Sequence, residues 1–197
     1  MAAQLFLITP PAVDPDTFRQ ALMRVLGAAE ISALLVSRGD HDAASYARLV
    51  EEAVNIGQGA GAAVLVEDDI DLARRLKADG VHITGPIAAI RDAVKALKPD
   101  MIVGAGPFKT RHDAMSAGEL DIDYVLFGAL AGTAAANAAE LASWWAETFE
   151  VPAVFSDPAS TASDAHGAEF LGLGEGLWSA PAPAAAMAVI AAALEQS

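Results

Sequence analysis

The chain contains no cysteine and few cations, and both shortages limit what it can do. Without cysteine it has no disulfide, no thiolate metal site and no cysteine nucleophile. Its 12 lysines and arginines are outnumbered by 26 aspartates and glutamates, which gives a formal net charge of −14. Proteins that bind nucleic acid usually carry a basic surface that displaces counterions from the phosphates, so we expect no nucleic-acid partner.

The sequence also lacks a long uninterrupted apolar segment. Residues 177–194 carry no charge, but Pro181 and Pro183 interrupt them, and the remainder predicts a helix of about three turns that packs on the protein. Residues 1–11 have no basic region ahead of their short apolar run, so they predict a first strand and not a signal peptide. We therefore expect no membrane partner and a cytoplasmic location.

What the chain has in quantity is apolar sequence, 54% of 197 residues, which is enough for one sizeable core and predicts a single domain over residues 1–197. Eight short apolar runs alternate with segments whose apolar residues recur at helical spacing. The runs are residues 5–9, 33–37, 62–67, 80–84, 101–105, 124–128, 152–156 and 170–174. This alternation indicates a parallel sheet with covered faces. Eight units favour a (β/α)8 TIM barrel, although a doubly wound open sheet has the same local pattern.

In such a barrel the chemistry lies at the carboxyl ends of the strands, and residues that precede a strand stabilise the opposite end. Asp79, Asp123 and Glu169 each stand just before a predicted strand, at a spacing that suits a barrel built by duplication. We predict structural turns there, with an Asx-type hydrogen bond at Asp79. His82 lies within a strand, and we expect a buried histidine whose hydrogen bonds are satisfied.

The predicted strand exits supply the candidate site residues. Arg38 and Lys109 are the cations placed to meet an anion there, and we assign them catalytic roles. The candidates for binding substrate or phosphate at the last three exits are Gly128, Ser156, Gly174 and Gly176. The last two glycines are placed to leave backbone N–H groups free after the eighth strand, where barrels often bind phosphate, although Glu175 between them would repel an anion unless it points away.

An acidic run, Glu67-Asp68-Asp69, follows the third predicted strand. Asp68 is placed to hold a metal ion or to accept a hydrogen bond from a ligand. The alternative is that Asp68 or Asp69 caps the following helix, because acids favour helix N-termini. The two roles are compatible for different members of the run.

Several segments resemble the thiamine phosphate synthase family, which includes the thiazole tautomerases. They are LFLIT at residues 5–9, VEDDIDLARRLKADGVHITG at 66–85, IVGAGPFKTRHDAMSA at 102–117, DIDYVLFGAL at 121–130 and VPAVFS at 151–156. The resemblance covers nearly the whole chain and implies a (β/α)8 barrel. It also implies that the protein joins a hydroxymethylpyrimidine diphosphate to a thiazole phosphate with the help of Mg2+. Asp68 occupies the position of one of the family's metal-binding carboxylates.

Other positions depart from the family's pattern. Arg38 is retained, but Asp40 stands where the family has lysine, and Ile87 where it has a second metal carboxylate. Residues 128–140 contain no lysine, and Ser156-Asp157-Pro158 replaces a Gly-Gly turn. We therefore predict an eroded site with weak or altered thiamine phosphate synthase activity.

Two alternatives stay open beside that prediction. One is a non-catalytic ligand-binding or regulatory paralogue, and the other is a divergent tautomerase-type enzyme, for which His112 is a displaced candidate. All three act on a small phosphorylated or heterocyclic ligand, and analogy with similar barrels suggests a homo-oligomer. If Lys109 shares a pocket with Arg38, an anionic or Mg2+-linked ligand is favoured; if Lys109 points to solvent, the non-catalytic alternative gains.

Overall fold

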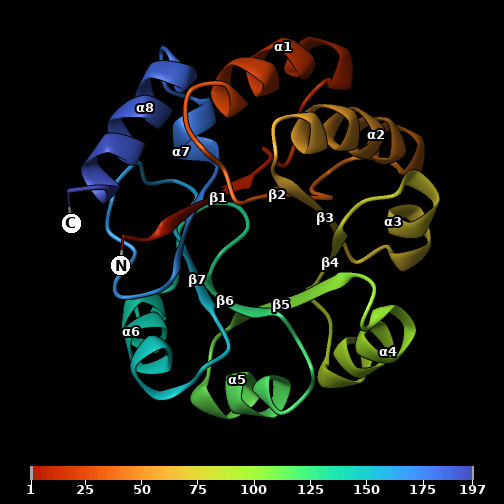
Figure 1. Ribbon diagram of the computed structural model, residues 1–197, viewed down its shortest axis with the longest axis vertical. Helices are drawn as coiled ribbons and strands as arrows, with labels where there is room; N and C mark the ends of the chain where they lie inside the picture. The colour runs from red at the N-terminus through yellow and green to blue at the C-terminus, as the bar shows by residue number, and fades with distance from the viewer. Residues whose placement is uncertain (1, 197) are drawn as a thin grey trace.

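The computed structural model describes residues 2–196 as a closed barrel of eight parallel strands (Figure 1). The strands are β1 (Gln4–Ile8), β2 (Ala33–Val36), β3 (Ala63–Glu67), β4 (Gly80–Ile83), β5 (Ile102–Phe108), β6 (Tyr124–Gly128), β7 (Ala153–Ser156) and β8 (Phe170–Leu173). Each strand pairs with its neighbours in the chain, and β8 pairs with β1 in register Leu5 to Leu171. That last pairing closes the sheet, so the predicted barrel is confirmed and the open sheet is excluded.

Helices surround the strands on the outside (Figure 1). They are α1 (Pro15–Leu26), α2 (Ala43–Gly59), α3 (Ile70–Leu76), α4 (Ile87–Leu97), α5 (Arg111–Gly118), α6 (Ala138–Thr148), α7 (Glu175–Trp178) and α8 (Pro183–Leu194). Pro183 occupies the first position of α8, where a missing N–H costs nothing, so the predicted C-terminal helix begins at this proline. None of the described helices is long and apolar enough to cross a membrane.

The strands are apolar on both faces because they pack in two directions. Leu5 and Leu7 of β1 belong to the cluster beneath the helices, whereas Phe6 and Ile8 point into the barrel. The interior cluster consists of Phe6, Ile8, Ala33, Leu35, Leu65, Tyr124, Leu126 and Val154. Within the described residues the barrel interior is thus filled by side chains, which leaves its two ends for a ligand.

Three acidic side chains fasten neighbouring strands together at the amino ends of the barrel. The Val64 amide donates to the Asp79 carboxylate, the Val103 amide to Asp123 and the Ala153 amide to Glu169. The donor–acceptor distance is 2.7 Å in each case. We call these contacts the amino-end brackets; they join β3 to β4, β5 to β6 and β7 to β8. The predicted structural role is confirmed, but the Asx-type turn at Asp79 is wrong, because its carboxylate reaches across to the adjacent strand.

His82 and Tyr124 form a hydrogen-bonded pair inside the barrel. His82 Nδ1 lies 2.8 Å from the Tyr124 hydroxyl, and its Nε2 lies 3.1 Å from the carbonyl oxygen of Gly106. A carbonyl can only accept, so Nε2 carries the proton and Nδ1 accepts from Tyr124. Burial lowers the pKa of His82 to about 4, so the ring is neutral at physiological pH. The predicted buried, satisfied histidine is confirmed.

Candidate active site at the carboxyl ends of the strands

The exits of β2 and β3 are joined by the side chain of Glu67. Its Oε2 accepts from the Ser37 hydroxyl at 2.9 Å and from the Arg38 backbone amide at 2.6 Å. The Arg38 guanidinium lies 3.7 Å from an Asp69 oxygen and 5.1 Å above the centre of the Tyr46 ring. Arg38 is therefore held at the mouth by an acid and an aromatic face, with 41% of its side chain exposed to meet a ligand.

Asp68 and Asp69 make different contacts, and of the two roles predicted for the acidic run the structure shows the capping role. Asp69 caps α3, accepting from the Leu72 amide at 2.9 Å, as predicted for one member of the run. Asp68 has a positive φ of 51°, which directs its carboxylate to Thr84 at the β4 exit, where it accepts from the amide at 2.8 Å and from the hydroxyl. Both Asp68 oxygens are thus engaged by Thr84.

These residues do not fit a magnesium site built from protein carboxylates. The segment after β4, residues 84–87, contains no acid, and Asp68 already binds Thr84. Within residues 2–196, no group of three or more His, Cys, Asp or Glu side chains gathers as a metal site would require. The described residues thus offer Mg2+ no cluster of protein carboxylates, and the assignment of the ion to Asp68 stays a prediction.

Lys109 is an exposed residue that lines a pocket of about 470 Å³ between the β4–α4 and β5–α5 connections. Thr84, Pro86 and Gly106 form part of the wall, and His112 shares the pocket with Lys109. Pro86 is the N-cap of α4 and makes no side-chain cap bond, so the helix presents uncapped amides here. Arg38 is not among the described residues that line this pocket. The two candidate cations thus occupy different parts of the mouth, with the Asp68–Thr84 contact between their strands.

Gly128 and Ser156 meet where β6 and β7 end. Gly128 has a φ of 114°, and a Cβ added to it would lie 1.8 Å from the Ser156 carbonyl oxygen, so only glycine fits. Ser156 is fully buried, and its hydroxyl has no hydrogen-bond partner within the described part of the chain. The structure therefore brings these two predicted residues together and buries Ser156, whereas Gly128 is partly exposed.

Gly174 and Gly176 pack against the connection after β7. The Gly176 amide donates to the Pro158 carbonyl oxygen at 2.6 Å, and a Cβ on Gly174 would lie 2.7 Å from Pro158 Cβ. The expectation of a free amide at Gly176 is therefore wrong. The glycines here permit close approach of two loops, a use that the sequence pattern alone does not distinguish from phosphate binding.

Two carboxylates that the sequence did not single out as hydrogen-bond acceptors lie over the same exits. Glu175 accepts from the Gly132 amide, and Asp157 accepts from the Ala134 amide at 3.1 Å. Their position was the available signal, since each acid closely follows the exit of a predicted strand. Which amides they would meet depends on how the loop at residues 129–137 folds across the mouth.

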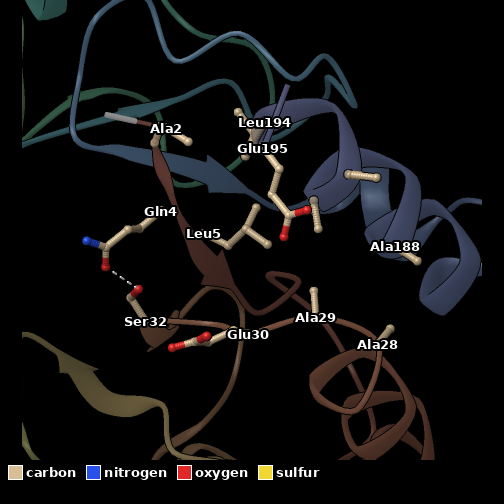
Figure 2. A pocket seen from close by; sticks show the side chains of 13 residues that line it. Ala2, Gln4, Leu5, Ala28, Ala29, Glu30, Ser32, Ala188, Leu194 and Glu195 are labelled. Atoms are coloured by element: carbon tan, nitrogen blue, oxygen red, sulfur yellow. Dashed lines mark hydrogen bonds between the residues drawn. The ribbon is translucent and has the colours of Figure 1, made fainter. Parts of the chain in front are cut away.

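A second pocket of about 470 Å³ lies at the opposite end of the barrel, between the start of β1, the α1–β2 connection and α8 (Figure 2). The Ser32 hydroxyl donates to Gln4 Oε1 at 2.6 Å there, and Glu30 and Glu195 are its charged lining residues. None of the described lining residues is a cation. Its place at the amino ends of the strands and its acidic charge make it a poor site for an anionic ligand.

The fold and the mouth together define a (β/α)8 barrel protein whose carboxyl end carries two separated cations, a pocket with a mixed apolar and polar lining, and several acids that already accept hydrogen bonds. The thiamine monophosphate synthase family matches residues 5–156. Thiamine-phosphate synthase of Rhodospirillum centenum is 35% identical and that of Hyphomonas neptunium 33% identical; the matches cover 94% and 98% of this chain and 94% of each relative. The chain therefore belongs to the thiamine monophosphate synthase family, as its sequence pattern predicted.

The barrel also agrees in shape with the solved structure of thiamine phosphate pyrophosphorylase from Pyrococcus furiosus. The two structures superpose with a TM-score of 0.81 over 99% of this chain and 96% of the other, at 19% sequence identity. At that identity the likeness supports the barrel fold alone. Family membership rests on the sequence matches.

Proposed function

We propose that the chain is a transferase of the thiamine phosphate synthase type, which joins a hydroxymethylpyrimidine diphosphate to a thiazole at the barrel mouth. The observation that carries this proposal is the family match over residues 5–156, together with relatives of that name over nearly the whole chain. Arg38 at the β2 exit supports it, because a departing diphosphate needs a cation beside it.

In this reaction the pyrimidine methylene carbon loses pyrophosphate, which leaves with the bonding electrons, and the thiazole nitrogen forms the new carbon–nitrogen bond. Negative charge grows on the pyrophosphate oxygens, so cations fixed beside them favour the transition state. We assign this role to Arg38 and Lys109, with His112 beside Lys109. Asp68, the one carboxylate proposed for Mg2+, already accepts hydrogen bonds from Thr84.

We further propose that the activity is weak or altered. The loop at residues 129–137 carries no lysine, Asp40 stands at the β2 exit, and Asp157 and Glu175 add negative charge at the β7 and β8 exits. A missing cation at such a site costs about 2–4 kcal/mol of transition-state stabilisation, which is roughly 30- to 1000-fold in rate.

Turnover by the purified protein with both substrates and Mg2+ tests this proposal. We expect slow product formation that falls at least about 30-fold in Arg38→Gln and in Lys109→Met. Lys95→Met, which removes an exposed charge from α4, is the matched control and should leave the rate unchanged. A wild-type rate of about 10 per second or more would contradict the weakened site. Complete absence of product would refute the transferase assignment.

The separation of Arg38 from the Lys109 pocket favours a second candidate, a binding or regulatory paralogue. Such a protein would bind the pyrimidine diphosphate in a calorimeter and release it unchanged. The tautomerase alternative has His112 as its proton-transfer group, and it predicts isomerisation of a thiazole substrate that is lost in His112→Gln.

A further inference from the structure

The β6–α6 loop, residues 129–137, is fastened across the exits of β7 and β8 by this chain's own carboxylates. The Gly132 amide donates to Glu175 Oε2, and the Ala134 amide donates to Asp157 Oδ1 at 3.1 Å. The Gly132 carbonyl oxygen accepts from the Ala159 amide at 3.0 Å, which adds a backbone bond between the same loops. Two neighbouring amides that point toward the β7 and β8 exits are therefore both occupied by acids.

Backbone amides at these exits are the donors that (β/α)8 proteins commonly offer to a phosphate. A carboxylate and a phosphate compete for such amides, because both are anions that accept N–H hydrogen bonds. With Glu175 and Asp157 in place, a phosphate would have to displace them and would then lie beside their negative charges. No cation in the described loop segment 129–137 offsets that repulsion.

An unpartnered hydroxyl lies beneath this closed loop. Ser156 directly precedes Asp157, its side chain is fully buried, and its Oγ points toward β8, where a Cβ on Gly172 would come within 2.8 Å of it. Buried hydroxyls normally have a hydrogen-bond partner. The Ser156 hydroxyl has none within the described residues, so a donor is left unused under the closed loop. Ser156, Gly132 and Ala134 thus place three donors at one end of the barrel, and carboxylates occupy the two amides.

We infer that Glu175 and Asp157 stand where a substrate phosphate would bind, and that they select a heterocyclic acceptor that carries no phosphate. This inference rests on the proposed transferase function. The acceptor is then a thiazole alcohol, whose ring nitrogen forms the bond to the pyrimidine methylene carbon while pyrophosphate leaves with the electron pair. The hydroxyl of the acceptor stays free, and the product carries no phosphate.

Inorganic phosphate is the probe that tests the occupied amides without any thiamine chemistry. In a titration followed by amide NMR, phosphate should leave the Gly132 and Ala134 resonances of the wild-type protein unmoved. It should shift both in Glu175→Gln/Asp157→Asn, with at least about tenfold tighter binding. Glu147→Gln/Asp121→Asn removes two exposed charges elsewhere and should behave as wild type. Equal shifts in wild type and double variant, or none in either, would overturn the inference.

The single variants Glu175→Gln and Asp157→Asn keep the test usable if the double variant does not fold. Turnover with the thiazole alcohol and with its phosphate ester forms the second arm. We expect the wild-type protein to prefer the alcohol by about tenfold or more in kcat/KM, and the preference to shrink or reverse when the charges are removed. A wild-type preference for the ester overturns the inference. If neither acceptor reacts while the phosphate titration behaves as expected, the transferase assignment fails and the occupied phosphate site stands.

Discussion

Acidification should destabilise this protein through one side chain, His82. The ring is buried and neutral, with both nitrogens hydrogen-bonded, and burial lowers its pKa to about 4 from 6.5. The unfolded chain binds a proton near pH 6.5, whereas the folded chain resists it until about pH 4. The stabilisation from a neutral His82 is therefore complete above pH 6.5 and is lost as the pH falls from 6.5 toward 4.

The two pKa values set the size of this loss. Proton linkage gives about 2 kcal/mol lost by pH 5 and about 3 kcal/mol lost by pH 4, relative to neutral pH. That is a large fraction of the roughly 5–15 kcal/mol by which a domain of this kind is stable. A change of this size is measurable well before the carboxylates that titrate near pH 4 contribute most of their effect.

Urea unfolding between pH 7.5 and pH 5, on the wild-type protein and on His82→Gln, measures the loss. The variant keeps a donor for the Gly106 carbonyl but leaves the Tyr124 hydroxyl without its acceptor, so we expect it to be about 1–3 kcal/mol less stable at pH 7.5. The difference in unfolding free energy between the two proteins should shrink by about 2 kcal/mol at pH 5. A constant difference across this range would refute the reasoning.

Two further predictions concern stability. Asp123→Ala removes the acceptor of an amino-end bracket and should cost about 1–3 kcal/mol in urea unfolding, whereas exposed Asp121→Ala should change stability by less than about 0.5 kcal/mol. Gly104→Ala would place a Cβ 1.9 Å from the Tyr124 ring and should lower Tm by about 5 °C or more, because the buried ring has no room to move. Gly59→Ala, with no atom within 4 Å of the added Cβ, is its control, and an equal loss there would contradict the packing argument.

The barrel could be predicted from the sequence because each strand is apolar on both faces and the strands alternate with segments of helical spacing. The short helix α7 (Glu175–Trp178) was not predicted, since four residues show no periodicity. The amino-end brackets were predicted only in part. The acids before the strands were visible, but their partners depend on strand register, which a single strand's pattern does not contain.

The candidate site was harder to predict than the fold. Arg38 and Lys109 were correctly placed at strand exits, yet sequence spacing could not tell that they occupy separate parts of the mouth. Gly174 and Gly176 matched a phosphate loop in composition, but glycine serves close packing as well as anion binding. Loop conformation decides between these uses, and it depends on contacts between segments far apart in the chain.

The amino-end brackets divide the barrel into modules of two strands. A chain break after β2, β4 or β6 leaves all three brackets within intact pieces, whereas a break after β3, β5 or β7 severs one of them. New chain ends in the β4–α4 connection at residues 84–86 would therefore part the barrel into two halves with their internal fastenings preserved. The bracketed pair, and not the single βα unit, is the smallest piece of this barrel that can be exchanged or permuted without cutting a cross-strand carboxylate bond.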